Sequence, residues 1–222
     1  LTCGEDYKKL YGALKTLVPN HILQILIAKP FNYEFDIRKV RYTFMFADIS
    51  GFTALSNELD KYGSEGVELL TKTISEIFEN FIAIIKKFKG SILKFGGDAL
   101  LVMFLENLNN PAEAKLNAVY TAKKLIDFIK EYSVDIFKKK YSFRIHIGLN
   151  SGEIFSTVLD FQKRRKEYYI FGKTLELLSR AEACASDNEI VATSEFIKSL
   201  NSSDEACASD NEIVATSEFI KS

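Results

Sequence analysis

The sequence predicts an α+β fold of the ferredoxin-like, split βαβ type (βαββαβ). In this fold an antiparallel sheet has helices on one face, and strand and helix additions follow on the C-terminal side. Hydrophobic periodicity changes along the chain in the order β-α-β-β-α-β before further elements follow. Two apolar runs, FMFADISGFTALS at 44–56 and SILKFGGDALLVMF at 91–104, are each interrupted by one aspartate near glycine. The strands carrying these acids, Asp48 and Asp98, are neighbours in a split βαβ sheet.

The composition restricts the class of protein. Lysine and arginine total 29 and aspartate and glutamate total 30, so the net charge of −1 gives no support for a nucleic-acid partner. Cys3, Cys184 and Cys207 have no metal-binding spacing, which fits a reducing, cytoplasmic environment. No apolar run reaches about 18 residues, so we expect no membrane segment in this chain. The chain begins at Leu1 and is expected to be a fragment, so targeting to a membrane or ciliary assembly would depend on sequence outside it.

The first half of the predicted fold begins with a strand at 40–48. This strand has no polar face, so both of its sides should be covered. A short helix at 54–59 follows, and then a long helix at 66–89 whose apolar residues recur at helical spacing. Gly90 is the expected C-terminal stop of the long helix.

A hairpin and a second long helix complete the predicted core. Strands at 92–95 and 99–104 flank Gly96 and Gly97, a dipeptide that allows the positive φ angles of a two-residue turn. A helix at 111–132 begins with proline and has a regular apolar stripe. The remaining predicted elements are strands at 142–150 (continuing at 152–159 past a bend), 167–171 and 189–192, and helices at 174–185 and, capped by Thr193, up to residue 200.

Three segments are predicted along the chain. Residues 1–39 read as a helical arm, with its helix at 7–29, and a connector, whereas residues 40–200 form one globular domain. In the tail, residues 201–222, the sequence EACASDNEIVATSEFIKS of 182–199 recurs letter for letter at 205–222. Because natural repeats diverge and solenoids need about three units, two identical copies indicate a splice or sequence-assembly artefact. The second copy is expected to have no partner element in the fold.

The residues around the two aspartates predict a metal and phosphate site. Asp48 and Asp98 would lie at one end of the sheet and can hold two divalent cations about 4 Å apart, with the Ile49 carbonyl as a further ligand. Either aspartate alone would suit an ordinary turn or helix cap, but the pair with these flanking residues favours the cation site. Amides at the following helix start would face the same phosphates: those of Ser50, Gly51, Phe52 and Thr53.

The FADISGFTALS and ILKFGGDALLVMF segments closely resemble the class III nucleotide cyclase catalytic domain, and the resemblance runs from about residue 42 to 199. It is greatest to the first catalytic domain of the soluble, bicarbonate-responsive adenylyl cyclases. The resemblance implies catalytic and metal-binding roles for Asp48 and Asp98 with two Mg²⁺ or Mn²⁺, ATP as substrate, and formation of 3′,5′-cyclic AMP. Lys94 matches a base-selecting position that holds Lys in adenylyl and Glu in guanylyl cyclases. His146 matches a position near the phosphates, although a solvated or packed strand histidine is the simpler interpretation.

Departures from the family pattern fall in its transition-state half. Counting from Gly172, the family's Asn and Arg positions hold Glu176 and Arg180 here, and Tyr169 replaces the second base-reading residue. Glu176 cannot donate a hydrogen bond as Asn does, and its charge would repel phosphate. The resemblance therefore implies the metal-donating half of an asymmetric pair, whose second cyclase domain would lie in the same parent polypeptide.

The second site of such a pair would use Lys94 and Arg180, two cations suited to a small anion. In the soluble cyclases the equivalent site binds bicarbonate, so the resemblance implies bicarbonate as an activator. The main rival function is a catalytically inactive pseudo-cyclase that serves as a regulatory or scaffolding module, which Glu176 and Tyr169 favour and the metal pair opposes. A guanylyl cyclase conflicts with Lys94, and a polymerase palm conflicts with the ISGFT turn.

Overall fold

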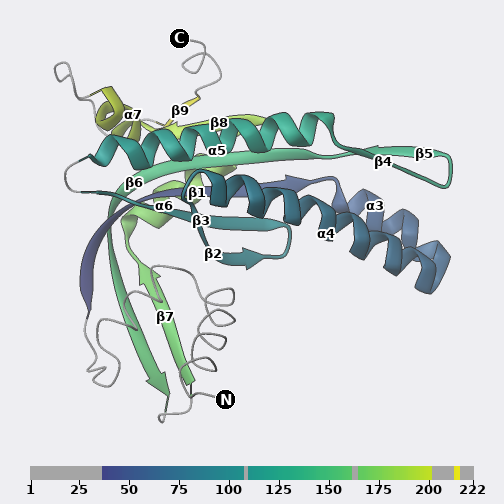
Figure 1. The fold of residues 1–222 in the computed structure, drawn as a ribbon, viewed down its shortest axis with the longest axis horizontal. Coiled ribbons are helices and arrows are strands. Elements are labelled where there is room, and N and C mark those ends of the chain that lie inside the picture. Colours follow the sequence, from purple (N-terminus) through teal and green to yellow (C-terminus); the bar gives the residue numbers. More distant parts are fainter. Residues whose placement is uncertain (1–36, 108–109, 162–164, 202–212, 216–222) are drawn as a thin grey trace, which may run out of the picture. The chain divides into compact units, whose positions relative to one another are not determined.

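The computed structural model describes residues 37–107, 110–161, 165–201 and 213–215 (Figure 1). The predicted helix at 7–29 lies outside these residues, as does most of the second repeat copy. Contacts divide the chain into two compact units, whose described parts are residues 41–154, 172–201 and 213–215 in the larger and residues 155–171 with 37–40 in the smaller. The functional residues discussed below lie in the larger unit, with the exception of Tyr169.

The sheet has the strand order expected of a split βαβ fold. Its order is β2-β3-β1-β6-β8-β9, and β3 pairs antiparallel with both β1 and β2. The order of its first four strands is that of the predicted βαββαβ core, and β8 is added parallel to β6. The strands are β1 (Arg38–Ser50), β2 (Ser91–Gly96), β3 (Ala99–Leu105), β6 (Arg144–Phe161), β7 (Arg165–Phe171), β8 (Glu189–Thr193) and β9 (Ile213–Ala215).

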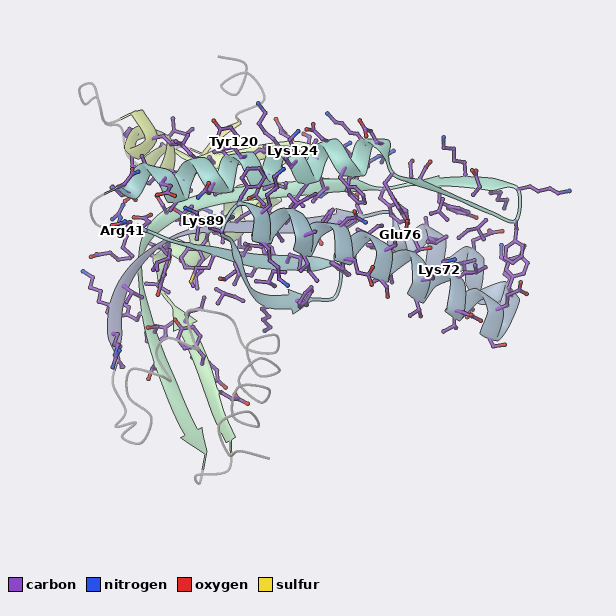
Figure 2. All side chains as sticks on the ribbon, in the orientation of Figure 1. Arg41, Lys72, Glu76, Lys89, Tyr120 and Lys124 are labelled. Atoms are coloured by element: carbon purple, nitrogen blue, oxygen red, sulfur yellow. The ribbon has the colours of Figure 1, made fainter. Side chains whose placement is uncertain are left out.

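Two long helices, α4 and α5, cover the core face of the sheet, as the sequence predicts (Figure 1). The main apolar cluster joins Ile77 and Phe81 of α4 with Leu125 of α5 and Met45 of β1. Charged side chains such as Lys72 and Glu76 of α4 and Lys124 of α5 lie on the outer sides of these helices (Figure 2). The helices are α3 (Phe52–Leu59), the 3₁₀ turn η1 (Asp60–Tyr62), α4 (Gly63–Lys87), α5 (Pro111–Glu131), α6 (Lys173–Ala183) and α7 (Ser194–Asn201).

The opposite face of β6 is covered by the added helix α6. Ile145 and Ile147 belong to the cluster with α4 and α5, so the alternate residues of β6 face the other way. A Cβ atom added to Gly148 would lie 2.6 Å from the Glu182 amide nitrogen and 2.7 Å from the Leu178 carbonyl oxygen of α6. Glycine at position 148 therefore lets α6 approach β6 closely.

The end of α4 differs from the prediction. The helix ends at Lys87, and Lys89 (φ 60°), not Gly90, takes the left-handed conformation. The Lys89 ammonium is held 2.6 Å from the Glu113 carboxylate of α5. A Cβ on Gly90 would lie 2.7 Å from Ile85 Cγ2 and 2.9 Å from Phe104 Cε1. Gly90 is therefore required by close packing rather than by a positive φ.

The β2–β3 turn is shifted by one residue from the prediction. Gly96 pairs with Ala99, so Gly97 (φ 74°) and Asp98 form the two-residue turn, whereas the sequence placed it at Gly96 and Gly97. Asp98 consequently lies in the turn itself and not on the following strand. This places its backbone within reach of β1.

A hairpin of β4 (Ser133–Ile136) and β5 (Lys139–Ser142) was not predicted. Its turn residues, Phe137 (φ 50°) and Lys138 (φ 67°), are left-handed although neither is glycine. The Phe137 ring stacks on Tyr62 at a centroid distance of 3.8 Å, which supports this conformation. The turn lacks the Asn-Gly type of signal by which a hairpin is recognised in a sequence.

The C-terminal additions agree with the prediction in most respects. β6 runs without interruption through the expected bend, and from Phe155 onward it pairs with β7 within the smaller unit. Thr193 Oγ1 accepts a hydrogen bond from the Phe196 amide at 3.2 Å, which confirms it as the cap of α7. The expectation that the second repeat copy has no partner is wrong for Ile213–Ala215, which pair antiparallel with β8 because they repeat the β-forming sequence of that strand. Among the described helices, none is long and apolar enough to span a membrane.

Candidate active site

The two predicted metal-binding aspartates are neighbours, Asp48 on β1 and Asp98 in the β2–β3 turn. Asp48 is half-buried near the end of β1, in register with Ala99 of β3. The Ile49 amide donates a hydrogen bond to the Asp98 carbonyl oxygen at 3.3 Å, so the β2–β3 turn is attached to β1 beside Asp48. The Asp98 side chain itself is exposed. The structure therefore brings the two acids together at one end of the sheet, as the sequence predicts.

The electrostatics of Asp48 reflect this proximity. Burial and, next, the negative charge of Asp98 raise the pKa of Asp48, while His146 and the Ile49 amide oppose the rise. Two carboxylates that repel each other across a partly open edge provide an environment that a divalent cation stabilises. Oxygen donors in this arrangement suit a hard divalent cation.

The turn from β1 into α3 leaves the helix start without a side-chain cap. Gly51 occupies the N-cap position with φ 115°, and no side-chain hydrogen bond caps α3. A Cβ on Gly51 would lie 3.2 Å from both Phe143 Cδ1 and the Ser142 carbonyl oxygen, so the position is sterically tight. Phe52 is buried and Thr53 is exposed. The amides at this helix start suit an anion such as a phosphate group.

A groove of about 370 Å³ runs beside Asp98. It joins the start of α3 to the β2–β3 turn and has one apolar wall from α4. Its volume lies within the range of small-molecule sites. It is lined by Phe52, Thr53, Ser56, Asn57, Leu70, Ile74, Phe78, Gly97 and Asp98.

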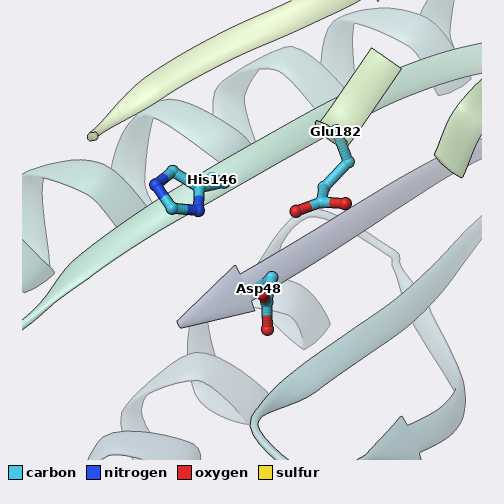
Figure 3. A group of neighbouring side chains, drawn as sticks. All are labelled: Asp48, His146 and Glu182. Carbon is cyan, nitrogen blue, oxygen red and sulfur yellow. The ribbon is translucent and has the colours of Figure 1, made fainter. Parts of the chain in front are cut away.

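A third carboxylate and a histidine converge on Asp48 from the α6 side. One ligand atom each of Asp48, His146 and Glu182 lies within 4.8 Å of the others (Figure 3). All three residues are half-buried. Burial, and then the charge of Asp48, raise the pKa of Glu182, whereas His146 lowers it. His146 thus lies among carboxylates, and its predicted contact with substrate phosphates stays a prediction.

The position of α6 is fixed by a buried polar network at its N-terminal end. The Asn150 side-chain amide donates to the Thr174 carbonyl oxygen at 2.8 Å, and its oxygen accepts from Thr193 Oγ1 at 2.6 Å. Thr174 Oγ1 in turn donates to the Glu153 carbonyl oxygen at 2.6 Å. These bonds connect β6, β8 and α6, and together with the contact at Gly148 they hold Glu182 over β6.

Glu182 was not identified from the sequence. Thr174 and Leu178 are buried on α6, and Glu182 continues this face at the same four-residue spacing. An acid on the buried face of a helix was the available signal. It was concealed because Glu182 also begins the repeated segment.

The predicted second-site residues lie on separate elements. Lys94 is exposed on β2, opposite Leu101. Glu176 and Arg180 are both exposed on α6, four residues apart and hence on one helix face. Tyr169 is exposed on β7 in the smaller unit, where its hydroxyl donates to Glu167. The groups that converge on Asp48 are thus different from those predicted for the second site.

The proteins and the family profile that match this chain are all nucleotide cyclases. The profile described as adenylate and guanylate cyclase catalytic domain matches residues 37–218. Adenylate cyclase type 10 of Rattus norvegicus is 30% identical over 163 residues, which is 66% of this chain and 9% of that protein. The receptor-type guanylate cyclase gcy-13 of Caenorhabditis elegans is 26% identical over 160 residues, or 72% of this chain and 15% of that protein. The chain thus spans about a tenth of the length of the type 10 relatives.

Solved structures share the fold. The adenylyl cyclase CyaB from P. aeruginosa matches with a TM-score of 0.62 and 24% identity, covering 82% of this chain and 90% of that one. The guanylate cyclase domain of RhGC from Catenaria anguillulae, solved with GTP, matches with a TM-score of 0.61 and 21% identity over 82% of this chain and 93% of that one. At these identities the similarity concerns the fold.

Proposed function

The chain belongs to the family of adenylate and guanylate cyclase catalytic domains, and from this membership we propose that it converts ATP to 3′,5′-cyclic AMP and pyrophosphate as the metal-donating half of an asymmetric pair. The observation that carries the proposal is the placement of Asp48 and Asp98 at one sheet end, beside the uncapped start of α3. The similarity to adenylate cyclase type 10 supports ATP over GTP.

Asp48 and Asp98 are the residues that would hold Mg²⁺ or Mn²⁺, with the Ile49 carbonyl as a further ligand. Their mutual repulsion and partial exposure fit a hard divalent cation. When bound, two such cations supply charge stabilisation for the attacking 3′ hydroxyl and for the pyrophosphate leaving group.

The rest of the chain positions the substrate. Amides from Ser50 to Thr53 bind triphosphate oxygens at the start of α3, and the groove beside Asp98 receives the nucleotide. The described motifs contain no evident general base, and we propose that the substrate itself accepts the 3′ hydroxyl proton. The protein contributes binding, orientation and fixed charge at the α-phosphorus.

The proposal of an asymmetric pair of cyclase domains rests on residues of α6. In the family pattern one domain supplies the metal site and the other supplies an Asn and an Arg to the transition state. Here the corresponding helix face exposes Glu176 and Arg180, so this chain lacks the neutral donor. The partner that we propose is therefore a second cyclase domain in the same parent polypeptide.

The degenerate second site is proposed to bind bicarbonate through Lys94 and Arg180. We expect Lys94→Ala to reduce stimulation by bicarbonate by a larger factor than it reduces ATP turnover. Complete loss of ATP turnover in this variant would contradict the assignment.

We further propose a catalytic domain at 40–200, an artefactual tail at 201–222, and a cytoplasmic location in association with a membrane or ciliary assembly.

The test is cyclic AMP production by the parent polypeptide from ATP and Mn²⁺. Asp48→Asn and Asp98→Asn should each lower the rate at least 100-fold, on the order expected when charge stabilisation of a transition state is lost. Asp60→Asn, which changes an exposed acid at the end of α3, is the matched control and should retain activity. A parent that is silent with every metal would favour the rival pseudo-cyclase, for which Glu176 and Tyr169 are the supporting observations. Preferential turnover of GTP would favour a guanylyl cyclase.

A further inference from the structure

We propose that Asp48, His146 and Glu182 form a Zn²⁺ site, and that Zn²⁺ bound there withdraws Asp48 from the Asp48–Asp98 pair. The first part concerns this chain's own residues alone. The second part, inhibition by Zn²⁺, rests on the proposed cyclase function.

The geometry is close to that of a three-ligand site. One nitrogen and two carboxylate oxygens lie within 4.8 Å of one another, and Figure 3 shows the three side chains as neighbours. Tetrahedral Zn²⁺ with ligand bonds of about 2.0–2.1 Å places ligand atoms roughly 3.3 Å apart. Side-chain rotations of Asp48 and Glu182 can close the difference, because both are on the half-buried rim of the site.

The orientation of His146 is an independent indication of a metal site. His146 Nε2 lies 3.1 Å from Asp187 Oδ1, and Asp187 Oδ2 is held 3.0 Å from the Arg144 guanidinium. With the Nε2 proton directed to Asp187, the Nδ1 lone pair is left for the side of Asp48 and Glu182 (Figure 3). A carboxylate that fixes the second ring nitrogen of histidine is the usual outer shell of a zinc ligand.

The donor set selects the metal. One imidazole with two carboxylates suits Zn²⁺, whereas Mg²⁺ is bound by oxygen ligands and keeps its water. Three protein ligands leave a fourth position for water, as in open zinc sites. The site near His146 is therefore chemically distinct from the oxygen-only pair of Asp48 and Asp98.

Asp48 is common to both sets of ligands. It lies between Asp98, whose charge raises its pKa, and the His146–Glu182 pair on the α6 side. A Zn²⁺ ion held by this carboxylate would repel a second divalent cation beside it and would draw on the charge of the same oxygens. Occupation by Zn²⁺ should therefore lower the affinity of the Asp48–Asp98 pair for Mg²⁺ or Mn²⁺.

The experiment is a calorimetric titration of Zn²⁺ into the chain without nucleotide. Cys3, Cys184 and Cys207 are first replaced by serine, because thiolates bind Zn²⁺ and Cys184 lies exposed two residues from Glu182. We expect one Zn²⁺ per chain. Asp187→Asn should weaken binding about 10- to 100-fold, as outer-shell changes do, and His146→Gln and Glu182→Gln should weaken it further.

Two variants serve as matched controls. His21→Gln removes the other histidine of the chain, and Asp98→Asn removes the acid that belongs only to the Mg²⁺ pair. Both should keep the Zn²⁺ affinity of the cysteine-free chain. The absence of Zn²⁺ binding, or unchanged affinity in His146→Gln, would overturn the proposal.

A second readout does not depend on variants of the site. In the His21→Gln chain only His146 remains, so the ring ¹⁵N spectrum reports this histidine alone. Zn²⁺ should shift the Nδ1 resonance and leave Nε2 protonated. Unshifted ring ¹⁵N resonances would contradict the site.

A separate assay tests the regulatory part. Zn²⁺ should inhibit Mn²⁺-dependent cyclic AMP production, and His146→Gln should relieve this inhibition. If the cyclase itself is inactive, the titration and the spectrum still decide the zinc site.

Discussion

Asp48 is influenced by charges of both signs. Asp98 and Glu182 repel its carboxylate from two sides, while His146 and the Ile49 amide favour its ionised form. Three carboxylates this close repel one another in the absence of a cation. The free energy of unfolding should therefore depend on pH and on bound metal.

The raised pKa of Glu182 determines the direction in which stability changes with pH. Its pKa is raised above the value of 4.5 that applies in the unfolded chain, so between pH 4.5 and the folded pKa the native state holds more protons than the unfolded chain does. Stability therefore falls as pH rises from 4.5 through the folded pKa and stays low above it. At pH 7 in a chelator, Glu182→Gln should raise the melting temperature, by about 2–4 °C for each kcal/mol of repulsion relieved. The gain should disappear below pH 4.5.

The measurement is thermal unfolding by circular dichroism between pH 4 and 8. Glu68→Gln, which changes an exposed glutamate on α4, is the control and should show no such pH-dependent gain. A lower melting temperature for Glu182→Gln at pH 7 would show that the carboxylate stabilises the fold and would contradict the assigned direction.

At the scale of elements, the packing of α6 on β6 determines whether Glu182 reaches Asp48. Gly148→Ala would bring a methyl group within 2.7 Å of two backbone atoms of α6, and backbone cannot rotate away as a side chain does. We expect a loss of about 1–3 kcal/mol of stability, as in overpacked cores, together with weaker Zn²⁺ binding.

The matched control for this substitution is Gly96→Ala. Its added Cβ would lie no closer than 4.0 Å to Ala99 Cβ, and its φ is not positive. Denaturant unfolding of both variants should separate them. Equal stability of the two would mean that the close approach of α6 is not required.

The buried amide of Asn150 provides a second test of the same element. Asn150→Ala leaves the Thr174 carbonyl and the Thr193 hydroxyl without this partner in a buried setting. Each unsatisfied group costs about 1–3 kcal/mol, so unfolding should require distinctly less denaturant. Thr71→Ala, which removes an exposed hydroxyl bond to Val67, should change little. A neutral Asn150→Ala would contradict the role given to this network.

Elements with a clear period could be predicted from the sequence, and those determined by tertiary contacts could not. The apolar runs of β1 and β3 and the stripes of α4 and α5 identified the core. The Phe137–Lys138 turn depends on stacking against Tyr62, and the turn at Gly97 and Asp98 depends on pairing register, neither of which a single segment specifies.

At the scale of the whole molecule, the candidate site also combines residues that a local motif reveals with residues that only the tertiary fold brings together. Asp48 and Gly51 lie in one short motif and Asp98 lies in another, so the chemistry of these residues is visible in the sequence. Glu182 and His146 are 36 residues apart and meet only because Gly148 lets α6 approach β6. Contacts between distant segments of this kind require the folded structure.

The central claim is that the chain has an intact metal half and lacks the transition-state half. It predicts that the chain becomes self-sufficient when Glu176→Asn restores the missing neutral donor and Tyr169→Thr restores a base-reading residue of the family. The most direct measurement is cyclic AMP formation from ATP and Mn²⁺ by the purified chain with and without these changes. The account predicts a gain of at least tenfold, abolished by adding Asp98→Asn. Full activity of the unchanged chain alone, no gain, or a gain that survives Asp98→Asn would contradict it.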